Sequence, residues 1–151
     1  MSGRQFALAT VVEASRPSPR GIGSVLAVSE DGDSFIGSVS AGCVENEVIQ
    51  AAKACMDDGQ TRWLTFGPEN GFPWEIALSC GGRIRVRVER FVGSANSAIG
   101  EALGNLLDEQ HSGLLLSADG GHCLFDESGT LLAEAGEVSE ELVQVGREHL
   151  K

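Results

Sequence analysis

The chain has 151 residues, 42% of them hydrophobic, which fits one globular domain with a real core and excludes two large domains. A formal net charge of -11, with only 5% aromatic residues and no tyrosine, argues against nucleic acid and anionic membranes as partners. Residues 1–93 hold nine Lys and Arg against eleven Asp and Glu, whereas residues 94–151 hold two against eleven. An anionic small molecule is therefore expected to bind the first part, while the acidic second part keeps the protein soluble or faces a basic partner.

The sequence has no run of eighteen apolar residues, so no membrane span is predicted. Its first residues lead into a strand-like segment without the architecture of a signal peptide, which predicts a cytoplasmic protein with reduced thiols. The four cysteines stand at positions 43, 55, 80 and 123 and form no CxxC pair, so a structural zinc site is not expected.

The first elements in the chain are predicted to be strands. Residues 6–12 are apolar and rich in β-branched side chains, as in a buried strand. Residues 15–24 contain two prolines and two glycines, which exclude regular structure, and their arginines and serines either grip a phosphate or carboxylate or form a solvated turn. Asp31-Gly32 lies between the apolar runs 25–28 and 34–39, a strong signal for a hairpin.

Residues 38–48 read as a strand end, a tight turn of small residues and the first turn of a helix. Cys43 lies at the join, where backbone N–H groups lack partners within the helix and the helix dipole is positive. Such a setting tends to lower the pKa of a thiol and also attracts phosphate. The alternative is that Cys43 is only a small residue in a crowded turn. The helix is expected to end near Gly59, with Cys55 in the core.

The rest of the chain continues the mixture of strands and helices. Residues 62–66 form a strand, and a glycine-containing turn with Cys80 precedes the alternating segment 83–89. In that segment Arg85 and Arg87 are expected on a solvated face, whereas Arg83 adjoins the Cys80 turn and is placed near a ligand. A helix across 95–110, strands at 113–117, 122–125 and 130–133, and a helix from Ser139 follow. We predict one domain of the α/β (α+β) class, with a mixed β-sheet flanked by about three helices.

The chemistry of the chain is expected in three glycine-containing turns, at residues 15–24, 40–43 and 79–83. Turns at one edge of a sheet can converge, and a helix N-terminus would then face two thiols and several arginines. This set suits a phosphorylated ligand that carries a soft metal or sulfur centre, since thiolates are soft ligands. The sequence has no Ser/His/Asp set and no Walker-type loop, so the residues themselves indicate a small-ligand binding module.

The same turns resemble the N-terminal domain of the XdhC/CoxI family, accessory proteins of molybdenum hydroxylases. The blocks that match occur in family order and are Ala9-Thr10-Val11-Val12, Ser18-Pro19-Arg20-Gly21, residues 37–45 with the core Gly42-Cys43-Val44-Glu45, Leu64-Thr65-Phe66-Gly67, Trp74-Glu75 and Cys80-Gly81-Gly82-Arg83-Ile84. The later helix, strands and helix are similar to the rest of that domain, so the resemblance covers nearly the whole chain.

The resemblance implies a chaperone that carries the molybdenum cofactor (molybdopterin) as cargo and is not a turnover enzyme. It implies a cysteine desulfurase as the source of sulfur for the cofactor and a xanthine dehydrogenase or CO dehydrogenase apo-enzyme as its recipient. Cys43 and Cys80 would contact the molybdenum or its sulfur. The pterin phosphate would be held by Ser18, Arg20 and the N–H groups around Gly42, Gly81 and Gly82, with Arg83 nearby. Glu45 is equally compatible with a capping carboxylate and with a ligand group.

Full-length members of the family continue into a Rossmann-type domain, whereas residues 1–151 correspond to the N-terminal domain alone. A separate polypeptide could supply the missing domain, and a homodimer is compatible with the sequence. Two other interpretations stay open. One is a thiol-dependent sulfurtransferase that carries persulfide sulfur on Cys43 or Cys80. The other is a partner-docking subunit with inert thiols.

Overall fold

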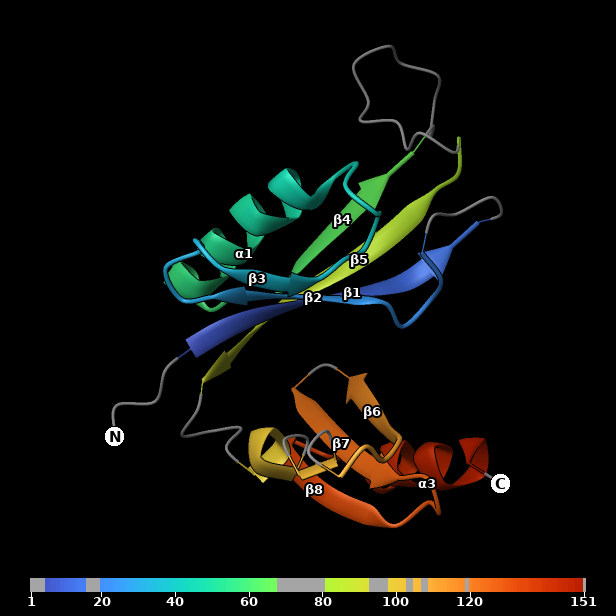
Figure 1. The fold of residues 1–151 in the computed structure, drawn as a ribbon. Coiled ribbons are helices and arrows are strands. Elements are labelled where there is room, and N and C mark those ends of the chain that lie inside the picture. Colours follow the sequence, from blue (N-terminus) through green and yellow to red (C-terminus); the bar gives the residue numbers. More distant parts are fainter. Residues whose placement is uncertain are drawn as a thin grey trace. The chain divides into compact units, whose positions relative to one another are not determined.

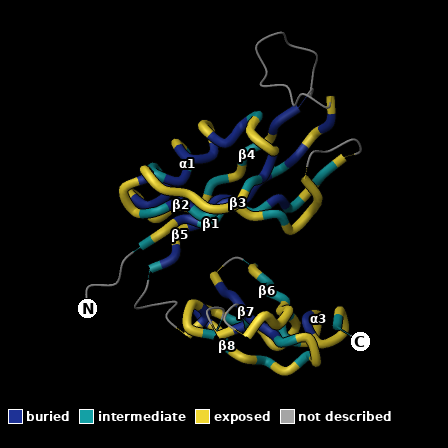
Figure 2. Tube along the Cα trace, in the orientation of Figure 1, coloured by how far each residue is buried: buried dark blue, intermediate teal, exposed yellow. Residues whose placement is uncertain are grey.

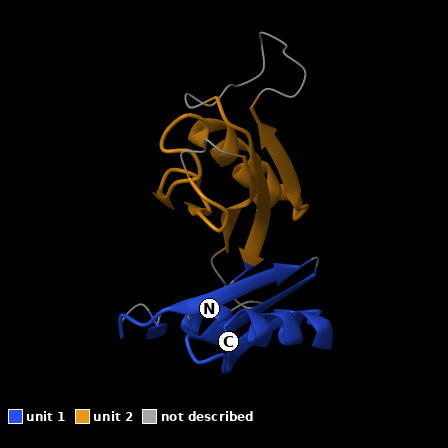
Figure 3. Cartoon of the chain, turned by 90° about the vertical axis from the view of Figure 1, so that its right-hand side faces the viewer, with its two compact units in different colours: residues 1–3, 92–151 blue, residues 4–91 orange. Residues whose placement is uncertain are grey.

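The computed structural model describes residues 5–15, 20–67, 81–92, 98–102, 105–106, 109–118 and 120–150. The chain divides into two compact units, one of residues 4–91 and one of residues 92–151 with 1–3 (Figure 3). Each unit contains its own antiparallel sheet (Figure 1). The predicted α+β class is confirmed, with the strands divided between two sheets where one mixed sheet was expected.

The larger unit is built on a five-stranded sheet in the order β3-β2-β1-β5-β4. Its strands are β1 (Gln5–Ala14), β2 (Val25–Ser29), β3 (Phe35–Gly37), β4 (Arg62–Phe66) and β5 (Ile84–Val92). The predicted hairpin around Asp31-Gly32 is confirmed, because β2 pairs antiparallel with β3 across this turn. Asp31 stabilises the turn by accepting hydrogen bonds from the Ser29 hydroxyl and the Asp33 backbone N–H.

Helix α1 (Glu45–Asp58) lies across one face of this sheet (Figure 1). The predicted glycine cap is confirmed, since Gly59 has φ 74° and donates to the Cys55 carbonyl at 2.8 Å. Buried positions on α1 alternate with exposed ones (Figure 2). The helix contributes Val48, Ala52 and Cys55 to a core that also takes alternate residues of β1, β2 and β5.

The opposite face of β5 differs from the prediction at one arginine. The inward positions of Ile84, Val86 and Val88 are confirmed, because all three are fully buried. Arg85 is partly exposed, but the side chain of Arg87 is only 7% exposed, with its Nη2 3.3 Å from Glu89 Oε1. The predicted solvated position of Arg87 is therefore wrong, since alternation assigns a residue to a face but not the exposure of that face.

The smaller unit contains the sheet β6 (Gly113–Ala118), β7 (Gly121–Asp126) and β8 (Leu131–Gly136), in that order. Helix α3 (Glu140–His149) begins at the predicted cap, where Ser139 Oγ accepts from the Leu142 N–H at 3.2 Å. Residues 98–102 and 105–106 are helical, as expected. In the described part of the chain, no helix has the length and apolar character needed to cross a membrane.

Candidate functional site

The topology of the larger unit places the described parts of the three glycine-containing turns, at residues 15, 20–24, 40–43 and 81–83, at one end of its sheet. β1, β3 and β4 end there and β2 and β5 begin there, because every neighbouring pair is antiparallel. In Figure 1 the arrowheads of β1 and β4 point toward this end. Three segments therefore meet the sheet at this same end: the one after β3, the one between β1 and β2, and the one before β5.

A buried carboxylate organises the turn between β3 and α1. Glu45 is the first residue of α1 and is 9% exposed. Its Oε1 accepts from Ser38 Oγ (2.6 Å) and from the backbone N–H groups of Val39 (3.2 Å) and Ser40 (3.0 Å). Its Oε2 accepts from Ser40 Oγ (2.5 Å) and the Gly42 N–H (2.9 Å). One side chain thus binds five donors of the turn that precedes it.

Glu45 is ionised in the folded protein at neutral pH. Burial by itself raises the pKa of the carboxyl, but the hydrogen bonds from Ser38 and Ser40 outweigh it and lower the pKa from 4.5 to about 2. The carboxylate therefore stays ionised over the physiological pH range and fills the position that an external anion would take. Of the two roles considered for Glu45, the geometry matches a carboxylate that caps and orders the turn.

This arrangement bears on the predicted phosphate contacts of the turn. The Gly42 N–H, expected to hold a phosphate, donates to Glu45. The Ala41 N–H donates to Ser38 Oγ at 2.8 Å and the Val44 N–H donates to Ser40 Oγ at 2.9 Å. These three backbone N–H groups therefore already donate to the side chains of Ser38, Ser40 and Glu45. None of the three is available to a ligand unless one of these hydrogen bonds breaks.

The turn has an unusual backbone. Ala41 has φ 59° and Gly42 has φ 109°, both in the left-handed range. An alanine is rarely found there, because its Cβ approaches the backbone too closely. Strain of this kind persists where surrounding contacts over-determine the conformation, as the hydrogen bonds to Glu45 and Ser38 do here.

Cys43 follows these two residues and immediately precedes Val44, the N-cap of α1. Its side chain is half-buried and packs against the core beneath α1. Cys55 and Cys123, by contrast, are fully buried, and burial raises the pKa of both thiols. The predicted core positions of these two cysteines are confirmed. Among the three described cysteines, Cys43 is the one that a solvent-borne ligand can reach.

The third turn lies against the ends of β1 and β4. The Ser15 N–H donates to the Arg83 carbonyl and the Arg83 N–H donates to Ser15 Oγ, both at 2.8 Å. Gly67 has φ 120°, and a Cβ there would lie 2.5 Å from the Gly82 carbonyl oxygen, so only glycine allows this close approach. Gly81 and Arg83 are exposed and Gly82 is buried.

Of the remaining predicted site residues, the structure describes some and not others. Arg20 is exposed in the described loop before β2. Ser18 and Cys80 lie outside the described residues, so their predicted contacts remain predictions. In the described part of the chain, no group of three His, Cys, Asp or Glu side chains could hold a metal ion.

Sequence reasoning missed a small cavity at the same end of the sheet. It has a volume of about 260 Å³ and is lined by Glu13, Ala14, Ser15, Arg83 and Arg85. Of these, the sequence placed Arg83 near a ligand and included Ser15 in the loop of residues 15–24, but it did not indicate Glu13, Ala14 or Arg85. The available signal was the density of arginine in residues 83–90, which hold four of the eleven Lys and Arg of the chain.

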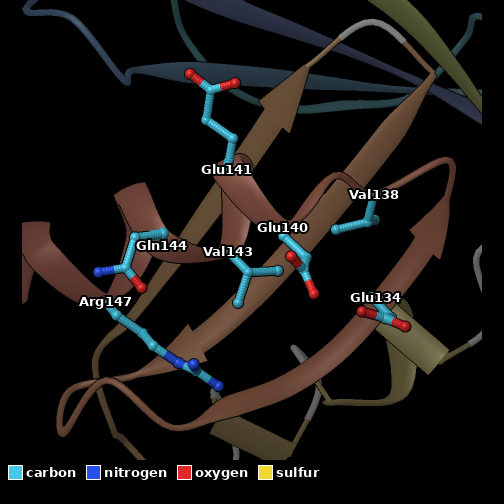
Figure 4. Close-up of a pocket in the computed structure, with 7 residues that line it drawn as sticks. All are labelled: Glu134, Val138, Glu140, Glu141, Val143, Gln144 and Arg147. Carbon is cyan, nitrogen blue, oxygen red and sulfur yellow. The ribbon is translucent and has the colours of Figure 1, made fainter.

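A second cavity, of about 590 Å³, belongs to the smaller unit (Figure 4). Its lining is mostly acidic and aliphatic and comes from β8, α3 and the segment between them: Glu134, Val138, Glu140, Glu141, Val143, Gln144 and Arg147. It contains no thiol and one cationic side chain, so its chemistry differs from that of the three turns.

Comparisons with known proteins agree with the resemblance. Residues 1–67 match the model of the XdhC and CoxI family. The molybdenum cofactor insertion chaperone PaoD of Escherichia coli (strain K12) is 37% identical over 91 residues, which are 60% of this chain and 28% of PaoD. The matched part thus spans well under two thirds of that relative. A crystal structure described as a xanthine dehydrogenase from Bacillus halodurans shares the fold, with a TM-score of 0.60, 21% identity, and coverage of 91% of this chain and 42% of that chain.

Proposed function

We propose that this chain, which resembles the XdhC and CoxI family over residues 1–67, is the N-terminal domain of a molybdenum cofactor chaperone. Residues 1–151 would bind the cofactor as cargo and pass it to a molybdenum hydroxylase of the xanthine dehydrogenase or CO dehydrogenase type. Sulfuration of the bound cofactor, with sulfur from a cysteine desulfurase, belongs to the same proposal, as does a location in the cytoplasm.

The observation that carries the proposal is the Cys43 turn. Glu45 binds five donors of this turn, so the backbone before Cys43 has one conformation and the thiol a defined position. A cysteine sulfur that is fixed in position and accessible is a soft ligand that suits molybdenum or its sulfur. A thiol that only filled space in a crowded turn would not need such an elaborate support.

The residues fit the cargo in part. Cys43 fits the metal end of the cofactor, and Cys80 is retained in that role as a proposal. The Gly42 N–H does not fit the phosphate end, because Glu45 occupies it. Arg20, Ser18, Arg83 and the turn at Gly81 and Gly82 are left as the groups that hold the phosphate.

The test is the molybdenum and pterin content of the protein, purified after co-expression with the cofactor pathway. Cys43→Ser is compared with Cys123→Ser, which removes a buried thiol of the smaller unit and serves as the matched control. We expect about one cofactor per chain in the wild type and in Cys123→Ser, and a loss of at least tenfold in Cys43→Ser. Cys80→Ala is run beside them to learn whether both thiols contribute.

The outcomes separate this proposal from its rival. A wild-type protein that carries no cofactor, even when cofactor is added directly, would contradict the chaperone. A sulfurtransferase would instead acquire persulfide from a desulfurase without any pterin, which cyanolysis detects as thiocyanate. Equal cofactor content in all variants would show that the thiols do not contact the cofactor. It would favour the interpretation as a partner-docking subunit with inert thiols.

A further inference from the structure

We propose that the cavity lined by Glu13, Ala14, Ser15, Arg83 and Arg85 binds a phosphate dianion, either free or as a phosphomonoester. The chain as a whole is strongly acidic, with a net charge of -11, yet two arginines line this one cavity. Arginine presents planar N–H donors that match the oxygens of phosphate in pairs. The cavity is therefore lined by two arginines and one glutamate, a net positive set of side chains in a chain of net negative charge.

Arg85 is held ready for such a ligand. Its guanidinium carbon lies 4.5 Å from the centre of the Trp63 ring, a cation–π contact that fixes the plane of the group. Its Nη1 lies 3.1 Å from Glu13 Oε1, and the two side chains are 40% (Arg85) and 64% (Glu13) exposed. An exposed ion pair contributes little stability, so a dianion can displace Glu13 at low cost.

The backbone positions both partners of this pair. Glu13 is the last residue but one of β1 and Arg85 is the second residue of β5, and the ion pair joins the two strands at this end of the sheet. The reciprocal hydrogen bonds of Ser15 and Arg83 then fix the end of β1 to the start of β5.

The Cys43 turn supplies the second line of argument. Its Gly42, Ala41 and Val44 amides are used by side chains of the turn, so a phosphate at this end of the sheet needs cations from elsewhere. Arg83 immediately precedes β5 and Arg85 is its second residue, so both arginines lie at this end of the sheet. The natural ligand would be the phosphate of the cofactor, and this part of the inference rests on the proposed function. The expected affinity for inorganic phosphate is independent of the proposed function.

The experiment is a titration of the protein with inorganic phosphate at constant ionic strength, with chloride as the balancing anion. Trp63 fluorescence reports binding, because the ligand moves the guanidinium stacked on this ring, and Trp74→Phe removes the other tryptophan. We expect saturable binding that weakens about tenfold in Arg85→Gln and tightens several-fold in Glu13→Gln.

Arg147→Gln, the same charge change on α3 of the smaller unit, is expected to leave the affinity unchanged. Arg85→Lys keeps the charge but loses the paired donors, so it should fall between wild type and Arg85→Gln.

A flat titration, or equal weakening in Arg147→Gln and Arg85→Gln, overturns the inference. The source of the phosphate is found by adding inorganic phosphate to cofactor-loaded protein, since competition places the phosphomonoester of the cargo in this cavity. The two proposals fail separately. If the protein binds phosphate but never carries molybdenum, the proposed function alone is contradicted. If wild type and Arg85→Gln carry equal amounts of cofactor and neither responds to phosphate, this inference alone is contradicted.

Discussion

Replacing Glu45 by glutamine tests whether its charge supports the Cys43 turn. Glutamine has the same shape, but it carries no charge and one of its terminal atoms is a donor. Wherever that NH2 group points, it meets donors from Ser38, Ser40 or Gly42 that have lost their acceptor. The fall in the Glu45 pKa from 4.5 to about 2 corresponds to about 3 kcal/mol in favour of the ionised form at neutral pH. We expect Glu45→Gln to lower the free energy of unfolding by a similar amount.

The assay is urea unfolding followed by tryptophan fluorescence, which reports the larger unit because Trp63 and Trp74 both belong to it. Since folding lowers this pKa, the stabilisation is complete above about pH 4.5 and is lost as the pH falls toward 2. The wild type should therefore lose stability across this window, and Glu45→Gln should lose less.

Glu47→Gln is the matched control, because Glu47 lies in the same helical turn but is exposed. It should cost about 0.5 kcal/mol, the usual contribution of a charge at a helix N-terminus. A Glu45→Gln protein that is within 1 kcal/mol of the control and keeps the same acid sensitivity as the wild type would refute the reasoning.

Three further changes probe the same end of the sheet. Ala41→Gly should raise the free energy of unfolding by about 1 kcal/mol in urea, because φ 59° costs glycine little; a loss of stability would show that the alanine methyl group makes a contact that outweighs the strain. Gly67→Ala should lower it by about 2 kcal/mol or more, since the new Cβ would meet the Gly82 carbonyl, and a neutral result would mean that β4 can withdraw from this turn. Alkylation mapped by mass spectrometry should label Cys43 well before Cys55 and Cys123, whose pKa values burial raises; similar rates for all three would contradict the exposure of the site.

The sequence predicted those features that depend on local pattern. The apolar spacing and Gly59 defined α1, and the alternation of Ile84, Val86 and Val88 defined the buried face of β5. The turn with Asp31-Gly32 predicted its hairpin for the same reason, since a few adjacent residues determine it. The antiparallel order of the strands was not predicted, because pairing partners lie far apart in the sequence.

The role of Glu45 lay beyond sequence reasoning for a different reason. A glutamate in the first turn of a helix can point to solvent, to a ligand or back to the preceding turn, and only the positions of five donors distinguish these. The burial of Arg87 and the pairing of Glu13 with Arg85 likewise depend on neighbouring strands. For these residues the sequence supplied the charge and the structure supplied its partner.

The two carboxylates at this end of the sheet have opposite consequences for anion binding. Glu45 is 9% exposed and accepts five hydrogen bonds. An anion that displaced this carboxylate would break several of these hydrogen bonds at once. Glu13 is 64% exposed and makes a single ion pair, which water and salt weaken. An incoming anion therefore cannot compete for the amides of the Cys43 turn but can compete for Arg85. This difference predicts that a phosphorylated cargo with a soft centre binds in one orientation, with the soft centre at the thiol and the phosphate at the arginines.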